Sequence, residues 1–252
     1  MMEFSPAVYL VAPLVVFAGY VVFGIGGFGA TIIIIPVLAQ FLPLKFVVPL
    51  LVLLDFGAAV LMRANKAADA RDKRELRWML PFMLIGMAAG AYLLKVTPER
   101  WLMLALGLFV AGYALSNLLR RKAGVGSIAR WWGAPLSVLG GIGSSVFGTG
   151  GAIYAIYVTR RIHEPGAMRA TMSTIIAVSV VVRLVVFTIA GLMLKIELGV
   201  GALALALFMV AGLFLGMRLH TRMDADQVRR VVHVLLVISG GSLVLRAAMM
   251  GV

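Results

Sequence analysis

The stretch that decides the fold lies at residues 131–159 and reads WWGAPLSVLGGIGSSVFGTGGAIYAIYVT. It contains no charged side chain, and uncharged runs also occupy residues 4–44 and 198–217. Apolar runs of about 20 residues are long enough to cross the hydrocarbon core of a bilayer. The composition agrees, since 62% of the 252 residues are hydrophobic and 13% are charged. The sequence therefore predicts an all-α integral membrane protein and not a soluble domain.

The basic residues are clustered, and their positions predict which face of the membrane each loop occupies. Cytoplasmic loops of membrane proteins retain Lys and Arg. Of the 23 basic residues, 17 fall in four loops, five fall on the opposite face, and Arg183 lies inside a predicted span. This distribution places both termini on the non-cytoplasmic side. The net charge of +13 is then explained by the topology of the chain in the lipid bilayer, and no nucleic-acid partner is expected. The helical segments predicted from the apolar runs are 6–23, 29–42, 45–62, 78–95, 100–119, 131–146, 151–160, 168–193, 197–217 and 227–250.

The run 131–159 is too short to hold two full crossings of about 20 residues and a turn. A single crossing would move the basic loops at 160–169 and 218–230 to the non-cytoplasmic face. We therefore expect a re-entrant hairpin that enters from the cytoplasm, turns within the membrane and returns. Irregular backbone at that depth is tolerated where it is buried in protein or lines a wet cavity. The turn of this hairpin is a candidate site.

The turn carries a motif that occurs twice. The segment Val146-Phe147-Gly148-Thr149-Gly150-Gly151 matches Val22-Phe23-Gly24-Ile25-Gly26-Gly27, 124 residues earlier. The two halves, 1–122 and 123–252, are thus each predicted to hold a re-entrant Gly-turn hairpin and three transmembrane helices. Because the first hairpin opens from outside and the second from inside, we predict an inverted-topology repeat. Secondary transporters of this architecture bind substrate near the midplane of the membrane.

A second pair of glycine motifs follows a similar spacing. Gly86 and Gly90 are matched by Gly212 and Gly216, which lie 126 residues later. Glycines four residues apart let the backbones of neighbouring membrane helices approach closely. We therefore interpret these four glycines as helix-packing positions.

The two V-F-G-x-G-G turns are interpreted differently, as parts of an anion site. Each turn would leave N–H groups exposed at the start of the next half-helix, near Ala30-Thr31 and near Ala152-Ile153. Helix N-termini carry partial positive charge and attract anions. The alternative is that these glycines also serve packing alone. A dinucleotide site is excluded, because residues 24–29 fit G-x-G-x-x-G but a lipid-compatible apolar run follows them.

With these paired motifs the chain resembles the sulfite exporter TauE/SafE family, and the resemblance covers most of its length. It implies a prokaryotic inner-membrane transporter that moves sulfite, an organosulfonate or a related small organic anion by alternating access. Two threonines that adjoin the turns, Thr31 and Thr149, would add hydroxyl donors. The resemblance assigns substrate binding to the glycines of the two turns, which are Gly24, Gly26, Gly27, Gly148, Gly150 and Gly151.

Asp55 and Arg183 are two charged residues at mid-depth of predicted spans. A lone charge there costs at least about 2.5–3.5 kcal/mol, so such residues are usually paired or functional. One interpretation is an Asp55–Arg183 ion pair that serves structure alone. In the other, Arg183 binds an oxyanion through its guanidinium fork, and Asp55 positions it or carries a coupling proton. Five hydroxyl residues of the spans either face the interior or bond to their own helix backbone: Ser144, Ser145, Ser173, Thr174 and Ser179. Tyr154 and Tyr157 either line a pathway or serve as packing or interface residues.

The competing functions need features that the sequence lacks. An intramembrane enzyme would need a Ser/His pair, an Asp pair or a metal cluster at membrane depth, so we expect no catalytic residue and no metal site. No cofactor is expected either, since cysteine is absent and no ATP-binding loop occurs. An exporter of the drug/metabolite type is the remaining alternative, although it would not need the matched glycine turns. A homo-oligomeric state is left open.

Overall fold

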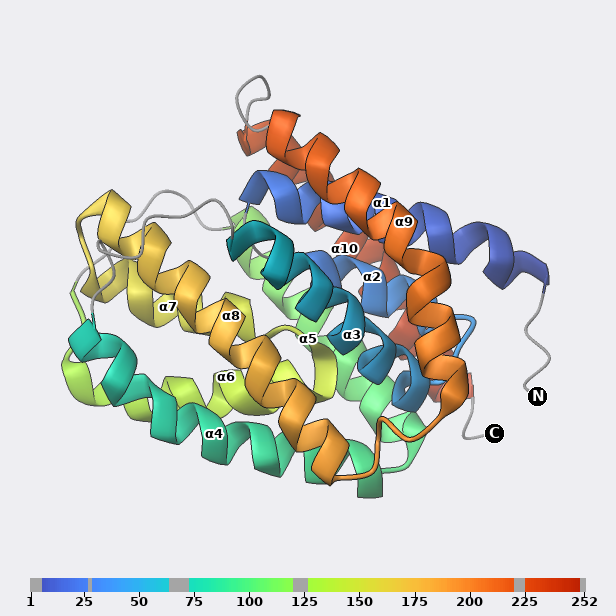
Figure 1. Cartoon of the computed structure of the whole chain (residues 1–252), viewed down its shortest axis with the longest axis horizontal. Coiled ribbons are helices and arrows are strands. Elements are labelled where there is room, and N and C mark those ends of the chain that lie inside the picture. Colours follow the sequence, from blue (N-terminus) through green and yellow to red (C-terminus); the bar gives the residue numbers. More distant parts are fainter. Residues whose placement is uncertain (1–5, 27–28, 64–72, 120–126, 220–224, 250–252) are drawn as a thin grey trace. The chain divides into compact units, whose positions relative to one another are not determined.

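The computed structural model describes residues 6–26, 29–63, 73–119, 127–219 and 225–249 (Figure 1). Across these residues the secondary structure is helical and no strand occurs, which confirms the all-α prediction for this part of the chain. Ten α-helices correspond to the ten predicted segments. They are α1 Pro6–Gly26, α2 Ala30–Leu38, α3 Leu44–Arg63, α4 Lys73–Val96, α5 Glu99–Leu119, α6 Gly133–Phe147, α7 Gly150–Arg161, α8 Pro165–Ile189, α9 Ile196–Leu219 and α10 Ala225–Met249, with a 3-10 turn, η1, at Arg130–Trp132.

The helices differ in whether they could cross a membrane. Within the described residues, α1, α3, α4, α8 and α9 are long and apolar enough to do so, and α10 has a shorter apolar part at Leu236–Met249. Three helices are short, since α2 has 9 residues, α6 has 15 and α7 has 12. At 1.5 Å per residue they are about 14, 22 and 18 Å long, which is less than the roughly 30 Å of a hydrocarbon core.

The described residues pack as two compact units. Unit 1 takes those of 1–50, 97–122 and 196–252, and unit 2 takes those of 51–96 and 123–195. The division falls inside α3, after Leu50. These units are not the predicted halves 1–122 and 123–252. A unit defined by packing and a repeat defined by sequence are different properties, so the two halves stay a prediction.

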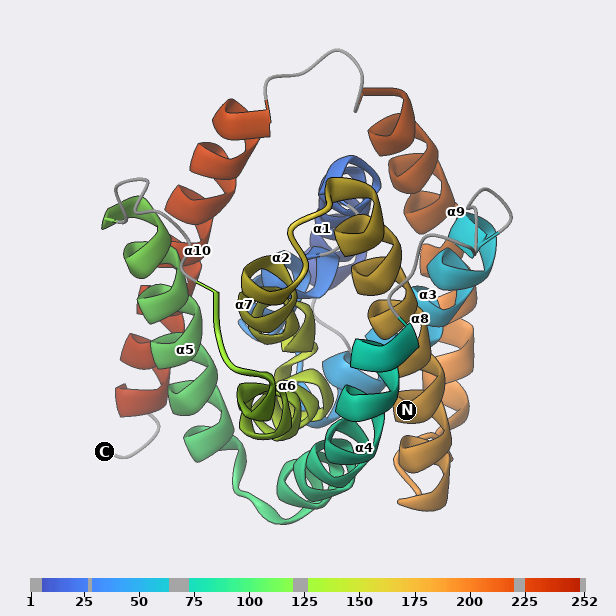
Figure 2. The same ribbon diagram turned by 90° about the vertical axis from the view of Figure 1, so that its left-hand side faces the viewer.

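In unit 1, α1 packs along α9 and α5 packs along α10 (Figures 1 and 2). Two glycines of α9 make the first of these contacts possible. A Cβ added at Gly212 would lie 2.4 Å from the carbonyl oxygen of Phe17, and one at Gly216 would lie 2.2 Å from that of Val21. Such distances are impossible for a real side chain, so the two backbones touch only because both positions are glycine.

Unit 2 repeats this arrangement with α4 and α6. A Cβ at Gly86 would lie 2.2 Å from the carbonyl oxygen of Val138, and one at Gly90 would lie 2.8 Å from that of Ile142. The interpretation of both glycine pairs as helix-packing positions is therefore confirmed. Behind this contact, α4, α7 and α8 share an apolar core that includes Met79, Met83, Met87, Tyr154, Tyr157, Val158, Ile162, Met172 and Ile175.

The close α4–α6 contact predicts the effect of a single methyl group. Gly86→Ala should lower the thermal unfolding midpoint of the purified protein in detergent, because overpacking typically costs about 1–3 kcal/mol. Gly112→Ala is the matched control, since a Cβ at Gly112 of α5 meets nothing within 4 Å. There the gain in helix propensity should leave the midpoint unchanged or raised. Equal midpoints for the two variants would contradict the close contact.

Candidate functional site

The site is built around the break between α6 and α7 in unit 2. The α6 helix ends at Phe147, and Gly148 follows with φ of 66°, a left-handed conformation that favours glycine. Gly148 N–H donates to the Ser144 carbonyl at 2.9 Å, and Thr149 N–H donates to the Gly143 carbonyl at 3.1 Å. Both bonds close the last turn of α6, so the chain can leave the helix with these carbonyls partnered. The next helix, α7, begins one residue later at Gly150.

Arg183 of α8 reaches this break from the side. Its Nη1 donates to the same Ser144 carbonyl at 2.8 Å, and its Nη2 donates to Asp55 Oδ2 of α3 at 2.6 Å. Both residues are buried, with 2% of Arg183 and 7% of Asp55 exposed. A cation near the C-terminus of a helix also interacts favourably with the helix dipole. The structure thus pairs the two charged residues and attaches the pair to the end of α6.

Some buried polar atoms of unit 2 are not satisfied within the described part of the chain. Arg183 Nε is buried without a hydrogen-bond partner, as are the Tyr154 hydroxyl of α7 and the Ser137 hydroxyl of α6. Ser179 and Arg183 are the polar neighbours of the Tyr154 hydroxyl. An unsatisfied buried donor or acceptor costs about 1–3 kcal/mol, so such atoms call for an explanation.

Small residues bring Tyr154 to this position. A Cβ at Gly140 would lie 2.3 Å from the Tyr154 ring, so the ring can lie on α6 only because that residue is glycine. One turn further along α6, the Ser144 and Ser179 hydroxyls lie 3.0 Å apart and bond to each other. Together, Arg183, Tyr154, Ser144 and Ser179 form a buried polar cluster at the break, with guanidinium and hydroxyl groups suited to an oxyanion.

The second glycine turn is placed at this cluster. Gly148 caps α6, and a Cβ at Gly150 would lie 2.5 Å from the Gly140 carbonyl and 2.6 Å from Ser144 Cβ. Thr149 is buried, and its hydroxyl donates to the Gly143 carbonyl at 3.3 Å. Gly151 lies in the first turn of α7. The substrate role of these four residues stays a prediction.

The first glycine turn differs from its prediction. The α1 helix continues through Gly24 to Gly26, whereas the expected segment ends at residue 23. A Cβ at Gly24 would lie 2.6 Å from the Leu213 carbonyl oxygen of α9, so packing holds this residue in the helix. Gly27 lies outside the described residues. The left-handed position, with φ of 100°, is Gly29, and α2 then begins at Ala30 as expected, with Thr31 buried in its first turn.

Sequence reasoning left out part of the cluster. Ser144 and Ser179 follow the interior alternative, since their hydroxyls bond to each other. Thr174 follows the other alternative and donates to the Ala170 carbonyl of its own helix. The available signal was spacing, because Ser179 precedes Arg183 by one helical turn and so shares its face of α8. Within the described residues no group of three or more His, Cys, Asp or Glu could hold a metal ion.

Long apolar helices, short helices that meet at a break, and a charged pair buried beside that break are features of helical membrane transport proteins. A model of the sulfite exporter TauE/SafE family matches residues 11–243, and the chain belongs to this family of membrane transporters. The resemblance found in the sequence is therefore confirmed.

A relative has a similar description. The chain is 29% identical over 202 residues to the probable inner membrane transporter protein TsaS of Comamonas testosteroni, across 77% of this chain and 81% of the relative. Both names describe transporters and not enzymes. No solved structure matches the chain.

The buried pair predicts strongly non-additive effects on stability. Asp55→Asn and Arg183→Gln should each lower the unfolding midpoint, because removing one partner of a buried pair costs about 3–5 kcal/mol. The double variant Asp55→Asn/Arg183→Gln should lose much less than the two single variants together, since neither charge is then left alone. Thermal unfolding of the four proteins in detergent measures this coupling. Additive losses would show that the two side chains do not depend on each other.

Proposed function

We propose that the protein is a secondary transporter that moves a small anion across the prokaryotic inner membrane, with Arg183 as its binding cation. The observation that carries the proposal is the buried Arg183 guanidinium, which leaves Nε without a partner beside the unpartnered Tyr154 hydroxyl. An oxyanion between these groups would accept hydrogen bonds from both. Charge-assisted bonds from a guanidinium are about twice as strong as neutral ones and match planar pairs of oxygens.

The substrate class follows from the donors and from the family. Sulfite, an organosulfonate or a related organic anion offers several acceptor oxygens around one small centre, which suits a site with one cation and several hydroxyls. The family description names sulfite export, which supports the same class. The N–H groups at the start of α7, near Gly150 and Gly151, would add positive potential close to Ser144.

Asp55 gives the proposal a means of coupling. The Asp55 carboxylate neutralises Arg183 at 2.6 Å. An anion that binds Arg183 would compete with this carboxylate for the guanidinium. Protonation of Asp55 would remove the competition and keep the buried charges balanced, so that the anion and a proton move together. Transport would then draw on the proton gradient.

The proposal includes alternating access by an inverted-topology repeat with re-entrant hairpins. It is supported by the recurring V-F-G-x-G-G motif and by glycine-mediated packing of the same kind in each unit, α1 on α9 and α4 on α6. The lengths of α2, α6 and α7 also suit helices that do not cross a membrane alone. The substrate role of Gly24, Gly26, Gly27 and Thr31 stays a prediction from the sequence. Both termini would face away from the cytoplasm.

The proposal is tested by uptake and efflux of labelled sulfite, sulfoacetate and taurine in proteoliposomes, with and without a pH gradient. The double variant Asp55→Asn/Arg183→Gln should fold and yet lose transport. Arg183→Lys keeps the charge but loses the fork, and should lower transport by about 10-fold or more, as expected for a charged hydrogen bond of roughly 1.5–3 kcal/mol. Wild-type rates in the folded double variant would show that the pair serves structure alone.

Tyr154→Phe separates binding from stability. The substitution removes a hydroxyl that has no hydrogen-bond partner, so the unfolding midpoint should stay the same or rise. If this hydroxyl binds the anion, the KM for transport should rise about 2- to 10-fold, which corresponds to one neutral hydrogen bond of roughly 0.5–1.5 kcal/mol. Tyr92→Phe is the control, since Tyr92 lies on α4 with 67% of its surface exposed. An unchanged KM for Tyr154→Phe would remove Tyr154 from the site.

A further inference from the structure

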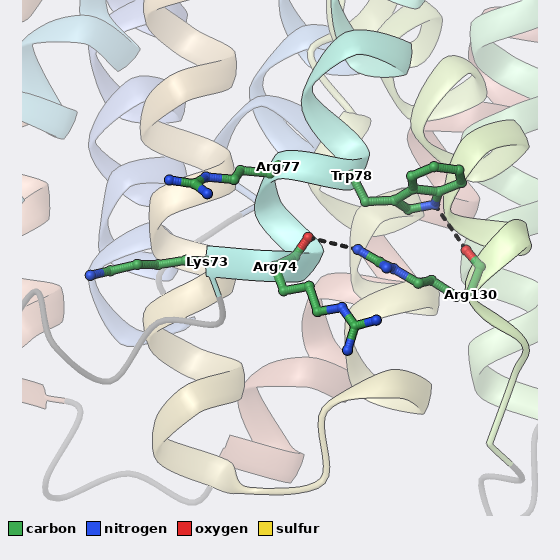
Figure 3. A pocket seen from close by; sticks show the side chains of 5 residues that line it. All are labelled: Lys73, Arg74, Arg77, Trp78 and Arg130. Atoms are coloured by element: carbon green, nitrogen blue, oxygen red, sulfur yellow. Dashed lines mark hydrogen bonds between the residues drawn. The ribbon is translucent and has the colours of Figure 1, made fainter.

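A basic hollow lies at the beginning of α4, apart from the Arg183 cluster. It has a volume of about 430 Å³ and is lined by Lys73, Arg74, Arg77, Trp78 and Arg130 (Figure 3). Four of the five lining residues are cations and none is acidic. All five belong to unit 2, so one packing unit forms the whole hollow. A concentration of positive charge of this kind attracts an anionic partner.

Arg130 and Trp78 hold the wall of the hollow in place. Arg130 Nη2 donates to the Arg74 carbonyl at 3.0 Å, and Trp78 Nε1 donates to the Arg130 carbonyl at 3.0 Å (Figure 3). The Arg130 guanidinium also lies over the Trp78 ring, 5.3 Å from its centroid. The segment before α6 is thus attached to the first turns of α4, and Arg130 is positioned before any ligand binds.

The Glu75 carboxylate of α4 is paired with several groups. Glu75 is 4% exposed, and it accepts a bond from the Tyr157 hydroxyl at 2.6 Å and one from Arg161 Nε at 3.2 Å. Its distance to Arg130 Nε is 3.6 Å, so it neutralises Arg130 in part. Lys73, Arg74 and Arg77 are exposed at the hollow. The described lining of the hollow is therefore predominantly positive.

The position along α4 favours a lipid over a soluble anion. The helix is long and apolar enough to cross a membrane from Lys73 to Val96. Its first turns would then lie at headgroup depth, where Trp is common. Beyond Arg77 the same face of α4 continues with exposed apolar side chains, including Leu84, Ile85 and Tyr92. A phospholipid could place its phosphate in the hollow and its acyl chains along this stripe.

We propose that this hollow binds the phosphate of an anionic phospholipid. The basic loops around it are those assigned to the cytoplasmic face, whose leaflet carries anionic lipids. The bound phosphate would join the beginning of α4 to Arg130, which directly precedes α6. Since α4 packs on α6 through Gly86 and Gly90, the lipid would brace the helix that ends at the Arg183 cluster. The lipid site needs only a membrane location and does not depend on the proposed substrate.

The test is lipid binding by the full-length protein in detergent, measured by native mass spectrometry. The probes are phosphatidylglycerol and phosphatidylcholine with identical acyl chains. Arg74→Gln/Arg77→Gln should weaken phosphatidylglycerol binding about 30-fold, from roughly 1 kcal/mol for each basic residue at a headgroup surface. Binding of phosphatidylcholine should not change. Arg74→Lys/Arg77→Lys should retain most of the phosphatidylglycerol binding.

The control variant is Lys95→Gln/Lys195→Gln, which removes two exposed cations from the opposite predicted face. It should bind phosphatidylglycerol as the wild-type protein does, and unfolding midpoints verify that all variants are folded. Equal losses in both Gln variants would overturn the site, because only net charge would then matter. A further arm uses glycerophosphoglycerol, the headgroup without acyl chains. Binding as tight as that of the lipid would overturn the lipid assignment in favour of a soluble phosphate.

Discussion

The interaction on which unit 2 depends is the double contact of the Arg183 guanidinium. One nitrogen donates to Asp55 of α3, and another donates to the Ser144 carbonyl at the end of α6. The same carbonyl accepts the Gly148 N–H that closes the helix. A buried cation therefore holds together a carboxylate, a helix terminus and a glycine cap. The break between α6 and α7 and the position of the charge are, for this reason, a single structural feature.

Close backbone packing determines the surroundings of the break between α6 and α7. Gly86 and Gly90 let α4 lie against α6, and Gly140 makes room for the Tyr154 ring. In the low-dielectric interior, hydrogen bonds are stronger and unsatisfied polar groups are more costly. The unpartnered atoms of Arg183 and Tyr154 therefore lower the stability of the folded protein. In the proposed function, an anion that accepts hydrogen bonds from both groups would offset this cost.

Much of the fold and part of the site could be predicted from the sequence. Apolar runs and glycine pairs act locally, and so the helical segments, the packing role of Gly212 and Gly216 and the family followed from residue order. The first glycine turn was misplaced by about one helical turn. Gly24 has little helix propensity, yet contact with the backbone of α9 keeps it helical, and Gly29 carries the left-handed turn instead. Contacts between residues nearly 200 positions apart leave no local signal.

By itself the sequence determined that the chain is a helical membrane protein with a strong charge asymmetry and with charged residues at mid-depth in two spans. These properties depend on hydrophobicity and charge along the chain, which follow from the order of the residues without any tertiary contact. Only the tertiary structure decided that Asp55 and Arg183 pair, that Ser144 receives the guanidinium, and that the Tyr154 hydroxyl is left without a partner beside them. Whether a buried polar atom is satisfied depends on angles and distances between several helices, and these arise only when the helices pack.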